Sequence, residues 1–200
     1  MTDETIARDQ GVAEQRHRIA NLFQLLSTLT RMRQQRSADP EAKRQLGWIL
    51  DAVSALGALQ QKMVEVDRYD FAGFLGDMQS QWRRRIGGRP VQLHVEAEPI
   101  LLREQLASAL AIIANELVAN AIHHAHPGER AGVVKVTLAP AGEGRATLTI
   151  SDDGVGYDGQ AQDRTKLGLW LIKGLADQVR GDLVTDMTRG CTARLEFPVA

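Results

Sequence analysis

Apolar residues recur every three or four positions over the first third of the chain. From about Glu4 to Arg36 this spacing predicts one long amphipathic helix, because 3.6 residues make one helical turn. A polar stretch follows, and Asp39 directly before Pro40 is typical of the start of a second helix. Together the two segments predict an antiparallel helical hairpin. Its two apolar stripes are Val12, Ile19, Leu22, Phe23, Leu26 and Leu29, and then Leu46, Ile49, Val53, Leu56, Met63 and Val66.

The pattern after residue 66 changes to a mixture of helices and strands. The predicted helices are 71–86, about 103–125 and 167–179, and the predicted strands are 91–95, 133–138, 146–151, 183–187 and 193–199. A polar loop at 154–166 separates the third helix from the strand before it. Because the last strands form hairpin-like pairs, a two-layer α/β sandwich is favoured over a doubly wound parallel sheet. The predicted fold class is therefore α+β, with a helical hairpin at 1–68 and a sandwich at 69–200.

The hairpin carries more apolar surface than its own two helices can bury. Two helices cannot cover both stripes by packing on each other alone, so a four-helix bundle formed by dimerisation is the natural completion. The alternative is a hairpin packed on the downstream domain.

Composition narrows the classes of partner. The chain has 200 residues, 44% of them hydrophobic, and a net charge of -1, so it lacks the basic field that favours nucleic acid or acidic membranes. The single cysteine, Cys191, excludes an internal disulfide framework and fits a reducing compartment such as the cytoplasm. An acidic N-terminal stretch and the lack of about 18 consecutive apolar residues argue against a signal peptide and a membrane span.

The stretch Ser151-Asp-Asp-Gly-Val-Gly-Tyr-Asp-Gly159 contains a Gly-x-Gly-x-x-Gly pattern. In a dinucleotide site such glycines open a helix directly, whereas here residues 160–166 have the composition of a loop. The preceding strand ends in Asp152 and Asp153, which are poor neighbours for a pyrophosphate and good acceptors for an amino group. Adenine offers such a group, so we expect a different kind of nucleotide site.

Three more segments fit that interpretation. Asn115 to Ala125 lies in a predicted helix that projects Glu116 and Asn120 from one face, where oxygen ligands suit Mg²⁺. Leu167 to Lys173 begins a helix whose first turn contains a glycine, and a helix N-terminus suits phosphate oxygens. The last strand is entered through Arg189-Gly-Cys-Thr192. Each segment alone is explained by packing or turn formation, but their order and spacing are specific.

Together these segments resemble the N box, the G1 box, the G2 box and the terminal Gly-x-Thr of the Bergerat (GHKL) ATP-binding fold, over roughly Phe71 to Ala200. The resemblance implies that Asp152 accepts from the adenine amino group, that Asn120 holds Mg²⁺ and that Glu116 lies beside the phosphates. The remaining ATP-site residues that it implies are Asn115, His123, Gly154, Gly156, Lys166, Gly168, Leu169 and Thr192. His123 stands where such kinases usually have Lys, so Lys166 or Lys173 would complete the charge compensation.

His17 lies on the polar side of the first helix. At 100° per residue it is about 160° from Ile19, so we expect it to be exposed. Glu14 and Asn21 lie within a turn of His17 on the same face. A carboxylate there can hold one ring nitrogen so that the other is presented as a nucleophile.

The segment from Glu14 to Leu26 resembles the phosphoacceptor helix of histidine kinases with the motif Glu-x-x-His-Arg-x-Lys-Asn, a group close to the HWE kinases. Ala20 replaces the usual Lys; the matching residues are Glu14, His17, Arg18, Asn21 and Gln24. The resemblance implies a homodimeric enzyme that uses Mg-ATP to phosphorylate His17 and then passes the phosphoryl group to an aspartate in the receiver domain of a response regulator. Neither nucleic acid nor a membrane is expected as a partner.

Two other functions remain open from the sequence. One is a histidine phosphotransferase with little or no ATP turnover, and the other is an anti-sigma-type serine kinase, which would have no use for His17. Outside the motifs, His126 before Pro127 is interpreted as a helix terminator. The tryptophans Trp48, Trp82 and Trp170 are interpreted as packing residues, with Trp170 also a candidate for contact with the nucleotide.

Overall fold

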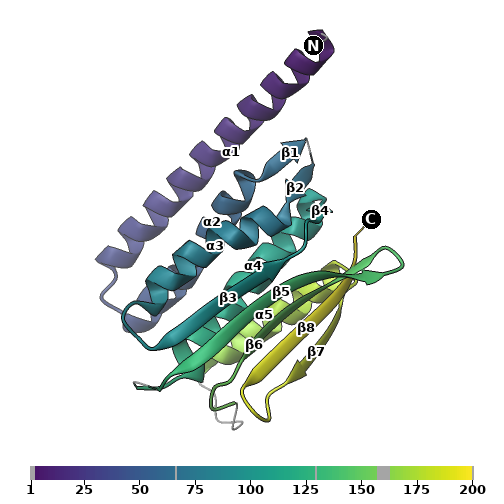
Figure 1. The fold of residues 1–200 in the computed structure, drawn as a ribbon. Helices are drawn as coiled ribbons and strands as arrows, with labels where there is room; N and C mark the ends of the chain where they lie inside the picture. Colours follow the sequence, from purple (N-terminus) through teal and green to yellow (C-terminus); the bar gives the residue numbers. More distant parts are fainter. Residues whose placement is uncertain (1–2, 66, 129, 157–162, 200) are drawn as a thin grey trace.

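The computed structural model describes residues 3–65, 67–128, 130–156 and 163–199 and consists of a helical hairpin followed by a layer of helices on a five-stranded sheet (Figure 1). The sheet order is β3-β5-β6-β8-β7, with β3 and β5 parallel and the other pairs antiparallel. The helices are α1 (Asp3–Arg36), α2 (Pro40–Gln60), α3 (Phe71–Ile86), α4 (Glu104–Asn120), η1 (Ala121–Ala125) and α5 (Asp163–Gln178). The strands are β1 (Met63–Glu65), β2 (Arg68–Asp70), β3 (Val91–Ala97), β4 (Leu101–Leu102), β5 (Gly132–Gly142), β6 (Arg145–Asp152), β7 (Asp182–Asp186) and β8 (Cys191–Pro198).

The start of the second helix is confirmed in detail, but its predicted end is wrong. The side chain of Asp39 accepts a hydrogen bond from the Glu41 backbone N–H at 2.9 Å, and Pro40 is the first helical residue. The helix ends at Gln60, whereas the apolar stripe predicts that it continues to Met63 and Val66. Met63 is instead buried in β1, which pairs with β2.

A small sheet, in the order β1-β2-β4, was not predicted. Its strands have two or three residues each, too few to show an alternating pattern. Through β2 it ties residues 63–65 to residues 101–102, so the end of the predicted first domain is hydrogen-bonded to the second. The division at residue 68 therefore remains a prediction.

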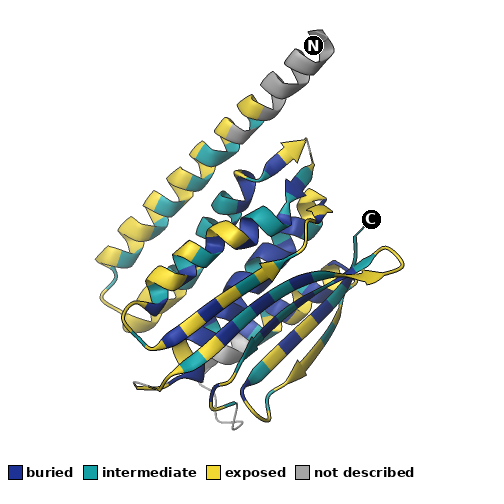
Figure 2. Ribbon diagram, viewed as in Figure 1, coloured by how far each residue is buried: buried dark blue, intermediate teal, exposed yellow. Residues whose placement is uncertain are grey.

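Alternation along the strands directs one face of the large sheet to the helices and the other to solvent (Figure 2). On β6 the buried side chains are Ala146, Leu148 and Ile150, and on β8 they are Ala193, Leu195 and Phe197. This period of two follows from the pleat of the strand. The pairing of β6 with β8 places both rows on the helix side of the sheet.

The central helix of the core is α4. The segment Glu104–Ala125 is long and apolar enough to cross a membrane by length and composition, but 72% of its most apolar window is buried inside the protein, as in a core helix. After Asn120 the predicted single helix widens into the π-helical turn η1. Arg89 Nη1 donates to the Ile122 carbonyl oxygen in this turn at 2.6 Å, and so supports its irregular backbone.

The two helices of the hairpin have different environments. Helix α2 lies against α3 and α4, and Asp51 forms an ion pair with Arg85 of α3 at 2.8 Å. Helix α1 lies on the outside of α2, and much of its surface is exposed (Figures 1 and 2). Packing on the downstream domain therefore covers α2 only. Among the described side chains of α1, the large apolar ones that are exposed are Leu22, Leu25, Leu26, Leu29 and Met32.

Candidate active site

Asp152, the last residue of β6, is held by the backbone around it. Its Oδ1 accepts hydrogen bonds from the backbone N–H groups of Gly154, at 3.0 Å, and Cys191, at 3.1 Å. Both bonds use Oδ1, which leaves Oδ2 as the oxygen able to accept from an amino group. Burial raises the pKa of Asp152 above its ordinary value, while these two hydrogen bonds oppose the rise.

The turn after Asp152 requires glycine because it approaches other backbone closely. A Cβ on Gly154 would lie 2.4 Å from the Ala125 carbonyl oxygen, and Val155 N–H donates to that same oxygen at 3.0 Å. Gly156 has a φ of +72°, and a Cβ there would lie 2.7 Å from the Met187 carbonyl oxygen. The turn is thus fixed against the end of η1 on one side and the β7–β8 connection on the other.

The predicted adenine contact of Thr192 is contradicted by the alternation of side chains between the two faces of β8. Asp152 pairs directly with Cys191 in the sheet, so these two side chains share the helix side, whereas Thr192 pairs with Ser151 and is exposed. Ala193 continues the buried row of β8 from Cys191. Burial, followed by the charges of Asp152 and Asp186, raises the pKa of the Cys191 thiol to about 11, so the thiol is neutral beside Asp152.

Glu116 lies in the space between three helices. It is 6% exposed, and its Oε2 accepts a hydrogen bond from Trp48 Nε1 of α2 at 2.7 Å. On another side it meets Gly168 of α5, where a Cβ would lie 2.6 Å from Glu116 Oε1. Asn120, one helical turn later, is half-buried at the end of α4. One amide ligand suits a Mg²⁺ ion that also takes phosphate oxygens and waters, so the residues fit that ion.

Asn115 does not face the same space. It is 3% exposed, and its Oδ1 accepts a hydrogen bond from the buried Trp82 Nε1 at 3.1 Å. The prediction that Asn115 contacts the cofactor is therefore wrong in this structure, because the amide is committed to the core. The packing role of Trp82 is confirmed.

The predicted start of α5 also differs. The helix begins at Asp163 instead of residue 167, so Gly168 is its sixth residue and the Gly168 N–H lies within the helical hydrogen-bond ladder. What Gly168 provides is the close approach of α5 to Glu116. Leu169 is half-buried against the core, and Trp170 is 72% exposed, so it is not a packing residue. The side chain of Lys166 lies outside the described residues.

His123 and His124 are both exposed in η1, with their ring centroids 6.3 Å apart. They are three and four residues after Asn120, so the position usually held by Lys is in a segment with two imidazoles. A neutral imidazole contributes no positive charge, and any compensation of phosphate charge by His123 depends on its protonation.

His126 is a component of the site that sequence reasoning missed. Its side chain is fully buried, and Nε2 lies 2.7 Å from Asp153 Oδ1, which also accepts from the Val133 N–H at 2.7 Å. The pKa of Asp153 is lowered by these hydrogen bonds, more by the one from Val133 than by the one from His126. His126 therefore joins the end of η1 to the acidic turn that begins at Asp152. The only signal in the sequence is a histidine placed just beyond the N box.

His17 is exposed on α1, as predicted, but its neighbours differ from the expectation. Asn21 Nδ2 lies 3.4 Å from His17 Nδ1, whereas the Glu14 carboxylate pairs with Arg18. The prediction that Glu14 holds the imidazole is therefore wrong for this conformation. The two ends of an amide are interchangeable in assignment, so Asn21 can equally present its oxygen to a proton on Nδ1.

The comparisons with known proteins match both parts of the chain. Residues 89–193 match the model of the histidine kinase-like ATPase domain, and residues 14–84 match a histidine kinase family model. The chain belongs to the histidine kinase family. The fold class expected from the sequence, including the Bergerat type of its second part, is confirmed by the solved histidine kinase structures that it resembles.

Among its relatives, this histidine kinase is 24% identical to blue-light-activated histidine kinase 2 of Erythrobacter litoralis, over 96% of this chain and 57% of that protein. The chain thus spans less than two thirds of that relative. The histidine kinase domain of the E. litoralis EL346 blue-light activated histidine kinase has a TM-score of 0.70 at 19% identity, covering 88% of this chain and 96% of that one. The Acinetobacter baumannii histidine kinase AdeS has a TM-score of 0.54 at 14% identity, with 88% and 96% covered.

In this histidine kinase the phosphoacceptor candidate and the ATP-site candidates lie far apart. Gly57 of α2 contacts Phe23 of α1, so the antiparallel hairpin places Trp48 level with residues 29–32 of α1. His17 is 12 to 15 residues from that level, which is roughly 20 Å along the axis at 1.5 Å per residue. The structure therefore does not bring His17 and Glu116 together.

Proposed function

We propose that this chain is an ATP-dependent histidine autokinase that phosphorylates His17 and transfers the phosphoryl group to an aspartate of a response regulator. One observation carries the proposal: the same chain has an exposed imidazole with an amide beside Nδ1 and, in its second part, a half-buried carboxylate whose two backbone hydrogen bonds use only one of its oxygens. The matching family models cover both segments.

In the proposed ATP site Asp152 accepts from the adenine amino group, and Gly154 and Gly156 let the backbone approach the base. Cys191 takes the adenine-side position that the resemblance implies for Thr192. Asn120 holds Mg²⁺, which neutralises phosphate charge when bound, and Glu116 lies beside the phosphates. His123, Gly168 and Leu169 complete the phosphate side.

In the proposed transfer, His17 Nε2 attacks the γ-phosphorus, the bond from phosphorus to the β,γ-bridging oxygen breaks, and ADP leaves. A proton on Nδ1, held by the Asn21 amide oxygen, keeps the lone pair on Nε2. Positioning and charge stabilisation supply most of the rate enhancement in phosphoryl transfer. The second transfer regenerates His17 and forms the aspartyl phosphate of the receiver domain.

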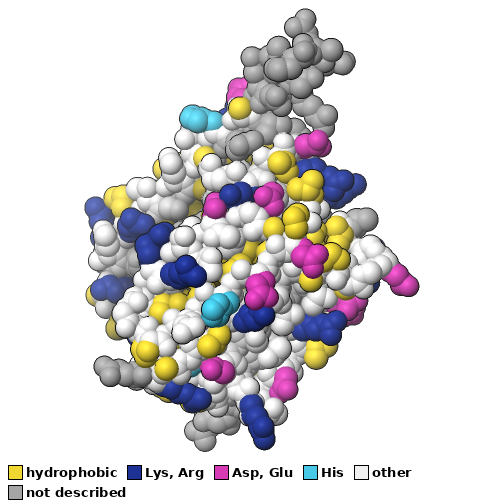
Figure 3. Space-filling model, viewed as in Figure 1, with side chains coloured by type: hydrophobic (Ala, Val, Ile, Leu, Met, Phe, Trp, Pro, Cys, Tyr) yellow, Lys and Arg dark blue, Asp and Glu magenta, His cyan; other side chains and the backbone are white. Residues whose placement is uncertain are grey.

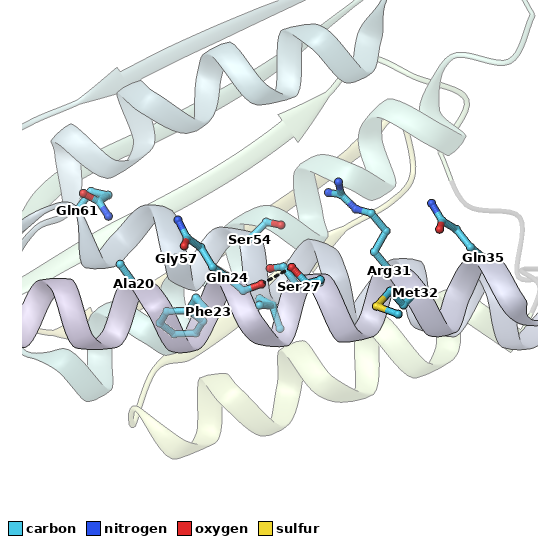
Figure 4. Close-up of a pocket in the computed structure, with 12 residues that line it drawn as sticks. Ala20, Phe23, Gln24, Ser27, Arg31, Met32, Gln35, Ser54, Gly57 and Gln61 are labelled. Atoms are coloured by element: carbon cyan, nitrogen blue, oxygen red, sulfur yellow. Dashed lines mark hydrogen bonds between the residues drawn. The ribbon is translucent and has the colours of Figure 1, made fainter.

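We also propose that two copies associate through α1. The exposed leucines described above form one apolar face of α1. A groove of about 570 Å³ between α1 and α2 opens on a different side of the hairpin, as helical periodicity shows, and is lined by residues that include Ala20, Phe23, Met32 and Gly57 (Figure 4). A second hairpin packed on the leucine face would bury it in a four-helix bundle. Elsewhere on the face drawn in Figure 3, basic and acidic side chains are interspersed, which favours no nucleic-acid or membrane surface. With its single cysteine, the chain fits the cytoplasm.

Incubation with γ-labelled ATP and Mg²⁺ tests the autokinase. We expect an acid-labile label that His17→Gln abolishes. His94→Gln is the matched control, because His94 is exposed on β3, bonded only to Gln92 among the described contacts, and remote from both motifs. A label that persists in His17→Gln would contradict the proposal.

The second candidate is a histidine phosphotransferase, which the separation of His17 from Glu116 favours. It predicts phosphoryl transfer to His17 from a phosphorylated receiver domain and no measurable binding of Mg-ATP in calorimetry. Binding that is lost in Asp152→Asn would exclude it. An anti-sigma-type serine kinase would retain full activity in His17→Gln.

A further inference from the structure

The hydrogen bond from Trp48 to Glu116 joins the hairpin to the ATP-binding part at the residue expected beside the phosphates. Trp48 Nε1 donates to Glu116 Oε2 at 2.7 Å, and the groups are 68 positions apart in the chain. Gly168 of α5 lies against the other oxygen of the same carboxylate. Both oxygens of Glu116 therefore have protein neighbours in this conformation.

A second contact fixes the same docking of α2. One turn beyond Trp48, Asp51 is paired with Arg85 at the end of α3 at 2.8 Å, and both side chains are partly shielded from water. A hydrogen bond and an ion pair that include charged groups outside bulk water are stronger than their exposed equivalents. The face of α2 that contains Trp48 and Asp51 is thus a specific docking surface for the ATP-binding part of the chain.

This docked arrangement is unproductive for transfer. It holds Glu116 at the level of residues 29–32, roughly 20 Å along α1 from His17 on the same chain. It also occupies Glu116 Oε2, so Glu116 cannot polarise a phosphate or an attacking group with that oxygen, whichever copy supplies the histidine. Release of α2 would remove both obstacles in one movement.

We propose that Trp48 is a latch: its indole N–H holds Glu116 in an inactive state, and the ATP site becomes competent only when the hairpin face of Trp48 and Asp51 undocks. The inference rests on the proposed autokinase function. Trp48 is a positioning residue that acts through Glu116. The latch couples any movement of the hairpin to the chemistry, because the same step frees the carboxylate and releases the ATP-binding part to approach His17.

Trp48→Phe is the direct test, since it keeps an aromatic ring and removes only the indole N–H and part of the ring area. We expect the initial rate of His17 phosphorylation to rise about tenfold, because a hydrogen bond to a charged group shifts an equilibrium by at least that factor. Asp51→Asn weakens the second contact and should raise the rate in the same direction by less. Ile49→Val is the matched control on the exposed side of α2 and should leave the rate unchanged.

Hydrogen–deuterium exchange of α2 and α4 in the full chain supplies a readout that does not require phosphoryl transfer. Faster exchange at their contact in Trp48→Phe, with a faster kinase, supports the latch. Faster exchange with no phosphohistidine in any variant supports the latch and refutes the autokinase. Unchanged exchange with an unchanged rate overturns the latch, and a reduced rate also overturns it, because Trp48 would then position Glu116 for the reaction.

Discussion

Removal of the Asp153 carboxylate gives a sharp test of how the acidic turn is held. In Asp153→Ala the buried His126 Nε2 and the Val133 N–H lose their common acceptor. A buried donor left without a partner costs about 1–3 kcal/mol, and the Val133 N–H is near water and costs less. We therefore expect the free energy of unfolding to fall by about 2–3 kcal/mol in Asp153→Ala.

Two further variants separate the contributions. Asp153→Asn keeps an acceptor oxygen and should cost about 1 kcal/mol, because it loses only the charge-assisted part of the bonds. His126→Phe should cost less than about 1.5 kcal/mol, since the ring keeps its volume, the exposed Asp153 can be satisfied by water, and the unpartnered buried Nδ1 disappears.

Urea denaturation of the unaltered protein, the three single variants and the double variant Asp153→Ala/His126→Phe, followed by far-UV circular dichroism at pH 7, measures these differences. The double variant should show a coupling of about 1–2 kcal/mol between the two sites. When His126 is already replaced by Phe, Asp153→Ala no longer leaves a buried histidine donor without an acceptor, so it should cost less stability than it does in the unaltered protein. Additivity within about 0.5 kcal/mol would refute the proposed role of the pair. Since the pKa of Asp153 is lowered in the folded state, its stabilisation is present at neutral pH and is lost as the pH falls through that lowered value, so the Asp153→Ala difference should shrink in acid.

Three other outcomes follow from the site. Gly154→Ala places a Cβ 2.4 Å from the Ala125 carbonyl oxygen, where backbone cannot yield, so we expect about 1–3 kcal/mol of destabilisation in urea and loss of ATP binding in calorimetry. Trp82→Phe leaves the buried Asn115 Oδ1 without its hydrogen-bond donor and should lower the free energy of unfolding by about 1–3 kcal/mol. The Kd for ATP should stay unchanged, because Asn115 faces the core. ATP affinity, measured by calorimetry as a function of pH, should fall on acidification at a higher pH than it would for an aspartate with an ordinary pKa. The reason is that burial raises the pKa of Asp152, and the protonated carboxyl group is a poorer acceptor. Asp152→Asn should bind ATP weakly, with an affinity that does not depend on pH over that range.

The sequence by itself determined the elements whose signals are local. The start of α2 at Pro40, the whole of α3 and the acidic turn at Asp152 follow from capping residues, helical periodicity and glycines that act over a few neighbouring positions. The alternating apolar residues of β8 also indicate which of its side chains face the core, and they place Cys191, not Thr192, on that side. That signal is local too, and it disagrees with the role that the Gly-x-Thr resemblance implies for Thr192.

Tertiary structure alone decided which residues that are distant in the sequence come into contact. Trp48 and Glu116 are distant in sequence, and nothing near either residue indicates their hydrogen bond. The partner of Asn115 is Trp82 for the same reason. The first stripe was predicted as apolar, but only the docking of α2 on α3 and α4 determines that α1 keeps an exposed face. Local propensities specify elements and their faces, whereas the packing of those faces depends on the sum of many long-range contacts that no short window of sequence contains.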